Sequence, residues 1–333
     1  MDSYNHPRFV VAIGASAGGL NYVIELIAQL NGDIDAAIFI VLHIAQTNYL
    51  NLVLERLQNN TSLNCKIAIN NDLIQRGALY LAPPDYHLIV KQGKIILGEG
   101  SHENRWRPSI DVLMRSAAVA YDNHSIGIIL SGLMTDGISG MIAIKKCGGT
   151  CIVQHPDEAE YPDMPISVLE NMDVDYIVPL NQMGPLIIEK LKNGNSEHHQ
   201  IPVETRIEAD IAERVASEIE NVSEIGIKSN YSCPDCGGGL WEVIGENIIR
   251  YRCHTGHVFT RDELLIKQNE ALENTLWIAL RMLEERSNLL KKMYREELGK
   301  GLMRNAGNKK ERYESLDIHI NRLKEILFES KKF

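Results

Sequence analysis

The sequence predicts an α/β fold in which a doubly wound, mostly parallel sheet is followed by a small cysteine-rich ribbon and an α-helical hairpin. From residue 8 to about residue 193, short apolar runs rich in β-branched residues alternate with helix-length segments. Continuous apolar strands of this kind are buried on both faces, as in parallel sheets covered by helices. A group of cysteines and histidines at 233–257 and long amphipathic stretches after residue 264 indicate the two further parts.

The expected strands are the apolar runs themselves. They are Phe9–Ile13, Ala37–Leu42, Ala78–Ala82, Ile126–Leu130, Thr150–Gln154 and Tyr176–Pro179. A further pair, His87–Val90 and Ile95–Leu97, is separated by a short Gly-containing turn and predicts a β-hairpin appended to the sheet.

Composition shifts along the chain predict four parts. Residues 1–193 form the sheet domain, the polar stretch 194–230 is a linker, 231–260 form the ribbon and 261–333 form the helical extension. Apolar residues at helical spacing predict one helix from Leu264 to about Tyr294 and another from Leu316 to Phe328. We expect the two helices to pack antiparallel, and they could also join two copies of the chain into a homodimer.

Charge and composition exclude several classes of function. The 333-residue chain has a net charge of −10 and a pI near 5.6, which disfavours nucleic acid or an anionic membrane surface as its main partner. It shows neither the pattern of a signal peptide nor an apolar run long enough to span a bilayer, so we expect a cytoplasmic protein without membrane insertion. Six cysteines in that compartment do not predict a disulfide framework.

A Gly-x-Ser-x-Gly turn follows the first expected strand at Gly14–Gly18 and places Ser16 between small residues. Such a turn presents a serine hydroxyl as a nucleophile, and the amides that follow it can donate to an oxyanion. The same glycines could instead cradle a phosphate at the helix N-terminus, or form only a tight structural turn.

Two further polar residues end apolar runs. His43 follows the strand ending at Leu42, and Asp136 lies in the loop after the strand ending at Leu130. Taken singly, a histidine at a strand end or an aspartate before a glycine is more often structural. The carboxyl ends of parallel strands meet at one edge of a sheet, so the three residues together predict a nucleophile, a base and an orienting carboxylate.

The chain also resembles a known family, the catalytic domain of CheB-type chemotaxis protein-glutamate methylesterases, over residues 8 to about 190. The motifs that carry the resemblance are Ala12–Gly19, the His43 segment, Leu81–Pro84 with His87, Arg105–Leu113, Ser131–Gly132 with Asp136–Gly137, and Met164–Pro165. The family hydrolyses γ-glutamyl methyl esters on chemoreceptor signalling domains, and some members deamidate receptor glutamines. The resemblance implies a triad of Ser16, His43 and Asp136, no catalytic cofactor, and methylated chemoreceptors or other chemotaxis regulators as partners.

The chain departs from the family pattern near these residues. Ala17 replaces a usual threonine. The family's Gly-Met-Gly-x-Asp-Gly reads Gly132-Leu133-Met134-Thr135-Asp136-Gly137 here, so Met134 stands where glycine is usual and a positive φ there would be strained. We also expect no phosphorylatable receiver domain before the first strand. The candidate oxyanion and substrate-binding residues are Ala17, Gly18, Leu133, Arg105, Arg107 and Met164. Two alternatives stay open: a non-enzymatic signalling adaptor on a drifted esterase fold, and an esterase for another methyl or acyl ester.

The cysteine-rich segment has the spacing of a closed tetrahedral zinc site. A C-x2-C pair at Cys233 and Cys236 is followed by Cys253 and His257, and these four are the expected ligands. His254 is the less favoured fourth ligand, and reduced cysteines in a glycine-rich loop are the alternative without metal. Four ligands leave no open position, so we expect a structural zinc. The segment resembles an extension found on some family members that lack a receiver domain, with docking or dimerisation as its expected role.

Overall fold

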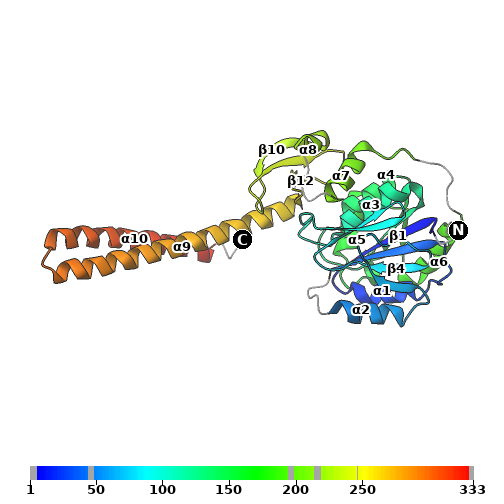
Figure 1. Ribbon diagram of the computed structural model, residues 1–333, viewed down its shortest axis with the longest axis horizontal. Helices are drawn as coiled ribbons and strands as arrows, with labels where there is room; N and C mark the ends of the chain where they lie inside the picture. The colour runs from blue at the N-terminus through cyan, green and yellow to red at the C-terminus, as the bar shows by residue number, and fades with distance from the viewer. Residues whose placement is uncertain (1–5, 44–48, 194–198, 214–218, 246, 330–333) are drawn as a thin grey trace. The chain divides into compact units, whose positions relative to one another are not determined.

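The structure, a computed structural model, describes residues 6–43, 49–193, 199–213, 219–245 and 247–329. The chain divides into two compact units, Met1–Glu263 and Leu264–Phe333. The first unit contains a central sheet, an appended hairpin and a second, smaller sheet, and the second unit is helical (Figure 1).

The central sheet has seven parallel strands in the order β3-β4-β2-β1-β7-β8-β9. They are β1 (Phe9–Ala15), β2 (Ala36–Leu42), β3 (Asn64–Ile67), β4 (Ala78–Leu81), β7 (Ser125–Ile129), β8 (Thr150–Gln154) and β9 (Tyr176–Val178). All six strands expected from apolar runs are confirmed. Strand β3 was not expected, because its sequence Asn-Cys-Lys-Ile is polar and partly exposed at the sheet edge.

Helices cover both faces of this sheet (Figure 1). One face packs against α1 (Gly19–Ile27), α2 (Leu50–Gln58) and α6 (Leu180–Lys192), and the other against α3 (Ile110–Tyr121), α4 (Ile138–Lys146) and α5 (Asp163–Asn171). Two short 3-10 turns, Asp122–His124 and Pro156–Glu158, complete the connections. Successive β1 residues alternate between the two cores, Val10 and Ala12 in one and Val11 and Ile13 in the other. Burial on both faces explains why β1 is apolar throughout.

The predicted hairpin is confirmed as β5 (His87–Lys91) and β6 (Lys94–Gly98), which pair antiparallel. Its Ile89 packs against Val112 of α3 and Ala212 of a later helix, α7 (Val203–Glu213).

A four-stranded antiparallel sheet lies at the end of the first unit, and we call residues 226–260 the cysteine ribbon. Its strands are β10 (Gly226–Ser232), β11 (Gly239–Val243), β12 (Arg250–Cys253) and β13 (Val258–Thr260), paired in chain order. The stretch 194–230, which we expected to be a linker, contains helices α7 and α8 (Ile219–Ile225) and strand β10, apart from 194–198 and 214–218, which lie outside the described residues. Ile211, Val222 and Ile225 bury against Trp241, an apolar cluster too sparse to stand out in a polar sequence.

Five buried charges join the ribbon to the rest of the unit, and we call them the buried ion cluster. Arg250 donates both terminal nitrogens to Glu208 of α7 at 3.1 and 2.9 Å. Arg252 donates to Glu103 at 2.6 Å, and Arg115 of α3 pairs with the same carboxylate. None of the five is more than 3% exposed. Glu208 of α7 is therefore paired with an arginine of the ribbon, and Glu103 is paired with one arginine of the ribbon and one of α3.

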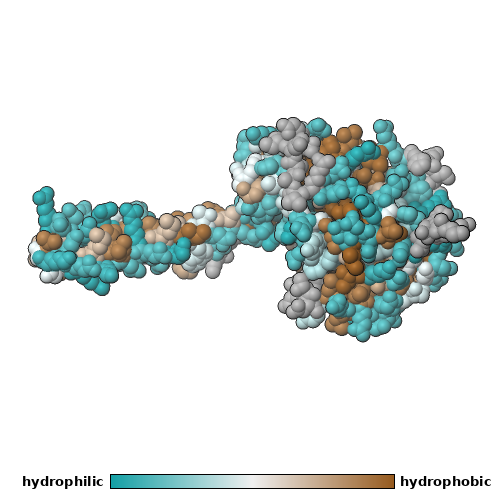
Figure 2. Space-filling model, viewed as in Figure 1, coloured by the Kyte–Doolittle hydropathy of each residue, from teal (hydrophilic) through white to brown (hydrophobic). Residues whose placement is uncertain are grey.

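The second unit is a helical hairpin. Helices α9 (Arg261–Gly299) and α10 (Met303–Glu329) are longer than the sequence predicted, and Leu280, Ile320 and Leu327 form their buried contact. Its visible face is mostly hydrophilic with scattered apolar residues (Figure 2). Among the described residues, the structure offers no helix with the length and apolar content that crossing a membrane requires.

The buried ion cluster predicts a large stability effect from a single arginine. Arg250→Met should lower the free energy of unfolding by about 3 kcal/mol, because Glu208 would stay buried without its two-pronged partner. Urea unfolding measures this loss. Lys91→Met is the matched control, because Lys91 pairs with Glu213 of the same helix in a partly exposed position, and its loss should stay under about 1 kcal/mol. Equal losses would contradict the role given to burial.

Candidate active site

The three candidate catalytic residues lie at the carboxyl ends of neighbouring strands. Ser16 follows β1, His43 follows β2, and Asp136 lies in the loop after β7. The N–H of Ser16 donates to the carbonyl of Ser131 at 3.0 Å, and the N–H of His43 donates to the carbonyl of Ala15 at 3.1 Å. Both residues thus continue the hydrogen bonding of the sheet. They sit where the strand order reverses between β1 and β7, the position at which open α/β sheets form clefts.

His43 and Asp136 contact each other. His43 Nε2 lies 3.1 Å from Asp136 Oδ2, and each side chain is 1% exposed. Both ring nitrogens of His43 are buried, and neither makes a hydrogen bond of good geometry among the described residues, so the pairing with Asp136 rests on proximity and charge. A histidine paired with a carboxylate at one nitrogen and without a partner at the other is suited to act as a general base.

Asp136 is kept ionised by the groups around it. Burial alone would raise the pKa of its carboxyl, but His43 and the donors of Ile110 and Ser109 hold that pKa below its usual value. The N–H of Ile110 donates to Asp136 at 2.7 Å, Ser109 Oγ at 2.8 Å, and Asn104 Nδ2 at 3.1 Å. A carboxylate with three such donors remains a charged partner for the imidazole.

A second buried carboxylate, Asp111, lies beside Asp136. It accepts from Asn104 Nδ2 at 2.7 Å and from the N–H groups of Gly137 and Gly140 at the start of α4. Burial and then the charge of Asp136 raise the pKa of Asp111 to about 8. The pair therefore carries its negative charge on Asp136 at neutral pH.

Trp106 covers one face of His43, and the sequence reasoning missed this contact. The two rings stack with centroids 3.9 Å apart and planes 8° apart. Trp106 is held by a tight turn in which Glu103 and Trp106 exchange backbone hydrogen bonds, with positive φ at Asn104 and Arg105. The motif at 105–107 drew attention to its arginines, and nothing in the sequence distinguished this tryptophan from a core residue.

Gly132 and Met164 fix the space behind Ser16. A Cβ on Gly132 would lie 2.1 Å from the sulfur of Met164 and 2.8 Å from Ser16 Cβ. The backbone N–H of Met164 donates to the carbonyl of Gly132 at 3.0 Å, and the methionine is buried. Met164 therefore packs against Gly132, which itself lies against Ser16.

The turn after Ser16 offers backbone donors. Gly18 precedes α1 with φ of 68°. Within the described residues, Ser16 and Gly19 donate their N–H groups to carbonyls, whereas no backbone acceptor is found for those of Ala17 and Gly18. Amides in this position at a helix N-terminus can stabilise a developing oxyanion.

Leu133 and Met134, the loop residues at which the chain departs from the family pattern, lie where the sequence suggested strain. Met134 has φ of 71°, and Leu133 is 41% exposed. A non-glycine residue in this conformation costs about 1–2 kcal/mol. Asp136 nevertheless reaches His43, so the substitution does not displace the carboxylate.

The two candidate substrate arginines differ in their surroundings. Arg107 donates to the carbonyls of Glu99 and Gly100 at 3.1 and 2.8 Å, so its guanidinium braces the backbone before the turn. Arg105 lies inside the turn with φ of 70°. A substrate role for either residue stays a prediction.

A groove of about 460 Å³ opens beside Ser16 and His43. Its other described lining residues are Ala17, Gly18, Leu20, Asn21, Leu42, Tyr49, Leu52, Val53 and Arg56. Tyr49 and Leu52 are each 51% exposed. The groove therefore combines an apolar rim with one cationic side chain.

The sequence and the fold of the first unit match those of known proteins. The sequence model of the family described as CheB methylesterase matches residues 11–187, more than half of the chain. The chain belongs to the CheB methylesterase family.

Solved and curated proteins agree with this family assignment. A crystal structure of the Thermotoga maritima CheB methylesterase catalytic domain matches with a TM-score of 0.52 and 30% identity, covering 54% of this chain and 97% of that one. A putative protein-glutamate methylesterase/protein-glutamine glutaminase of Leptospira interrogans is 37% identical over 190 residues, 56% of this chain and 96% of the relative. A protein-glutamate methylesterase/protein-glutamine glutaminase of Methanococcoides burtonii is 32% identical over 56% of this chain and 55% of its own length.

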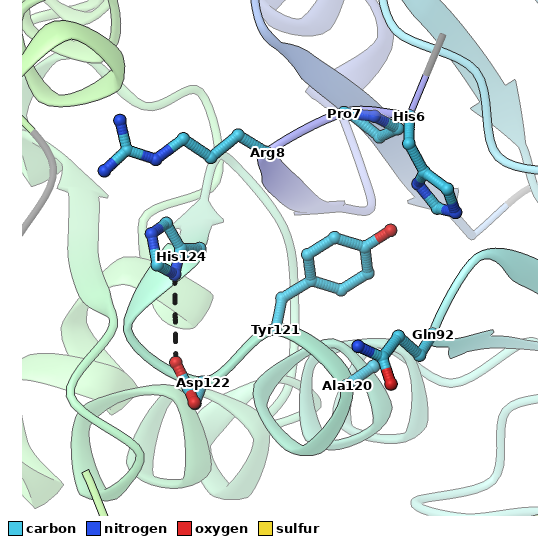
Figure 3. Close-up of a pocket in the computed structure, with 8 residues that line it drawn as sticks. All are labelled: His6, Pro7, Arg8, Gln92, Ala120, Tyr121, Asp122 and His124. Carbon is cyan, nitrogen blue, oxygen red and sulfur yellow. Dashed lines mark ion pairs between the residues drawn. The ribbon is translucent and has the colours of Figure 1, made fainter. Parts of the chain in front are cut away.

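Figure 3 shows a different pocket of this methylesterase. It is lined by residues that precede β1, such as His6 and Arg8, and by Tyr121, Asp122 and His124, which precede β7. The pocket lies at the amino ends of the strands, so it is not part of the site around Ser16.

The cysteine ribbon brings together the four residues predicted as metal ligands. Ligand atoms of Cys233, Cys236, Cys253 and His257 all lie within 4.8 Å of one another. Two sulfurs, those of Cys236 and Cys253, are 3.8 Å apart, and His257 Nδ1 is 3.5 Å from the sulfur of Cys253. His254 is not a member of this group.

The packing around Gly132 predicts the effect of one added methyl group. Gly132→Ala should lower the rate of Ser16 labelling by a fluorophosphonate about 100-fold, because a displacement of about 1 Å at a reacting group can cost that much. Circular dichroism should show an unchanged fold. Labelling at the wild-type rate would mean that Met164 and Ser16 can shift to accommodate the methyl group without loss of Ser16 reactivity.

Proposed function

We propose that this methylesterase is a serine hydrolase that demethylates γ-glutamyl methyl esters on chemoreceptor signalling domains, using Ser16, His43 and Asp136. The main support for the proposal is the contact between His43 and the buried, ionised Asp136. These two residues follow the strands on either side of β1, the strand that ends before Ser16. The names of the relatives support a protein-glutamate substrate. Such a substrate would place the enzyme in the cytoplasm.

The proposed reaction has two halves. Ser16 Oγ attacks the ester carbonyl while His43 Nδ1 takes its proton, and the N–H groups of Ala17 and Gly18 stabilise the oxyanion. His43 then protonates the departing methoxide, which leaves as methanol. Water, deprotonated by His43, hydrolyses the acyl-serine and releases the glutamate carboxylate. Asp136 stabilises the imidazolium in both halves.

The same residues would support glutamine deamidation. The carbonyl, the oxyanion and the acyl-serine are common to both reactions, and His43 would protonate ammonia instead of methanol. The relatives named above carry both activities in their names, which favours this second reaction.

The groove suits a helical, acidic substrate. The exposed side chains of Tyr49 and Leu52 suit contact with apolar residues of a receptor helix. Arg56 offers a positive charge to carboxylates on the same helix. The exposed apolar residues of α9, which include Leu272, Ile278 and Met282, suit the docking or dimerising role proposed for the helical unit.

We also propose that the cysteine ribbon holds one structural zinc. With Zn–S of about 2.3 Å and Zn–N of about 2.0 Å, tetrahedral angles put two sulfurs about 3.8 Å apart and a sulfur and a nitrogen about 3.5 Å apart. The corresponding distances here are 3.8 and 3.5 Å. Asp235 Oδ2 lies 3.9 Å from His257 Nε2, an ion-pair distance.

Substitutions in the triad test the esterase reaction. Ser16→Ala and His43→Ala should abolish methanol release from methylated chemoreceptor signalling domains, and Asp136→Asn should lower kcat about 10⁴-fold because the imidazolium loses its charged partner. Peptide mapping should locate fluorophosphonate on Ser16 and not on the neighbouring Ser131. Methanol release by Ser16→Ala would refute the mechanism, while no release from wild type with a labelled Ser16 would indicate another ester.

Metal analysis tests the zinc proposal. The purified chain should contain one zinc per molecule, and Cys253→Ser should lose it because three ligands bind zinc more weakly. Cys65→Ser is the matched control, since Cys65 lies outside the cluster and should retain full metal content. Zinc-free wild-type protein, or equal zinc in both variants, would contradict the assignment.

A further inference from the structure

The cysteine ribbon and Glu263, which its last residue Thr260 holds, contact both loops that hold the catalytic pair. One is the turn at 103–106, which presents Asn104 to Asp136 and Trp106 to His43. The other is the loop that carries Asp136 itself. Neither contact was foreseen, because the sequence predicted a ribbon separated from the esterase by a linker.

The first contact reaches Asp136 through Asn104. The backbone N–H of Asn104 donates to the carbonyl of Val258 in β13 at 3.0 Å, and its side chain donates to Asp136 at 3.1 Å. The preceding residue, Glu103, is fixed by Arg252 of β12 at 2.6 Å. The ribbon thus holds the backbone of a residue whose side chain holds the catalytic carboxylate.

The same turn also places Trp106. Its backbone N–H donates to the carbonyl of Glu103 at 2.9 Å, so the position of Trp106 depends on that of Glu103. Trp106 in turn covers the ring of His43. Movement of Glu103 would therefore disturb the general base as well as the carboxylate.

The second contact runs through the residue before Asp136. Thr135 Oγ1 donates to Glu263 Oε1 at 3.1 Å. The other carboxylate oxygen of Glu263 accepts from the N–H of Thr260 at 3.0 Å, and the N–H of Glu263 donates to Thr260 Oγ1 at 3.3 Å. This reciprocal pair is a capping box at the start of α9, so Glu263 is itself held rigidly.

We propose that the cysteine ribbon, together with Glu263 just after it, positions the active site, with Arg252 and Glu263 as positioning residues that hold Asp136 and His43 in their reactive arrangement. The inference rests on the proposed serine chemistry. It also gives the Cys/His cluster a role in catalysis, because Cys253 adjoins Arg252 and His257 adjoins Val258. Assembly of the Cys/His cluster would then also bring the ribbon and Glu263 into contact with the turn at 103–106 and with the loop that carries Asp136.

Thr135 gives the sharpest test, since substitution of Glu103 or Arg252 could unfold the chain. Thr135→Val keeps the shape of the side chain and removes the hydrogen bond to Glu263, whereas Thr135→Ser keeps the hydroxyl. The readouts are kcat and KM for methanol release from receptor domains, and the second-order rate of fluorophosphonate labelling at Ser16. The full-length chain is used throughout.

The expected result is a fall of about tenfold in both kcat and the labelling rate for Thr135→Val, equivalent to about 1.4 kcal/mol, with KM unchanged. Thr135→Ser should stay within about twofold of wild type. Lys146→Met serves as the control, because it removes another contact to the ribbon, the bond to the carbonyl of Gly245, away from His43 and Asp136. It should leave both rates unchanged.

Other results would overturn the inference. Wild-type labelling of Thr135→Val would show that the ribbon does not position the site, and a rise in KM alone would make it a docking element. Equal losses in Thr135→Val and Lys146→Met would indicate general destabilisation. Failure of the wild type itself to react with fluorophosphonate would instead refute the proposed serine chemistry.

A second measurement uses the Cys/His cluster. Cys236→Ser should lower the labelling rate at Ser16 at least as much as Thr135→Val, while Cys65→Ser should not change it. Unchanged labelling in Cys236→Ser would show that the Cys/His cluster does not affect the reactivity of Ser16.

Discussion

The structure of the active site depends on keeping one buried negative charge, that of Asp136, in contact with His43. A carboxylate without water is costly, and here the cost is offset by donors from Asn104, Ser109 and Ile110 in addition to the imidazole. These donors belong to the turn at 103–106 and the start of α3. The loop after β7, the turn and the helix must therefore come together before the charge is tolerated.

Much of the fold could be predicted because its signals are local. Strand β1 is buried on both faces and apolar throughout, so its seven residues stand out in the sequence. Ser16, His43 and Asp136 follow such strands, and the geometry of parallel strands brings their ends together. The strain at Met134 was also foreseeable, because φ near +70° is unfavourable for any residue with a Cβ.

What the sequence did not reveal depends on contacts between distant residues. Arg252 and Glu103 are 149 positions apart, and each alone would be taken for a surface charge. Trp106 could equally have been a core residue. Helices α7 and α8 were hidden by a polar composition, since only a few of their residues, such as Ile211 and Val222, are buried. Tertiary packing decided each of these cases.

The proton held by Asp111 sets an upper limit of pH for this arrangement. In the unfolded chain this carboxyl ionises near 3.8, whereas in the folded chain its pKa is about 8. The folded state therefore binds a proton that the unfolded state has already released, and the resulting stabilisation is complete below pH 4 and is lost as the pH rises to 8. Above that, two carboxylates repel each other beside His43. Alkaline conditions would thus weaken the packing around Asp111, Asp136 and His43.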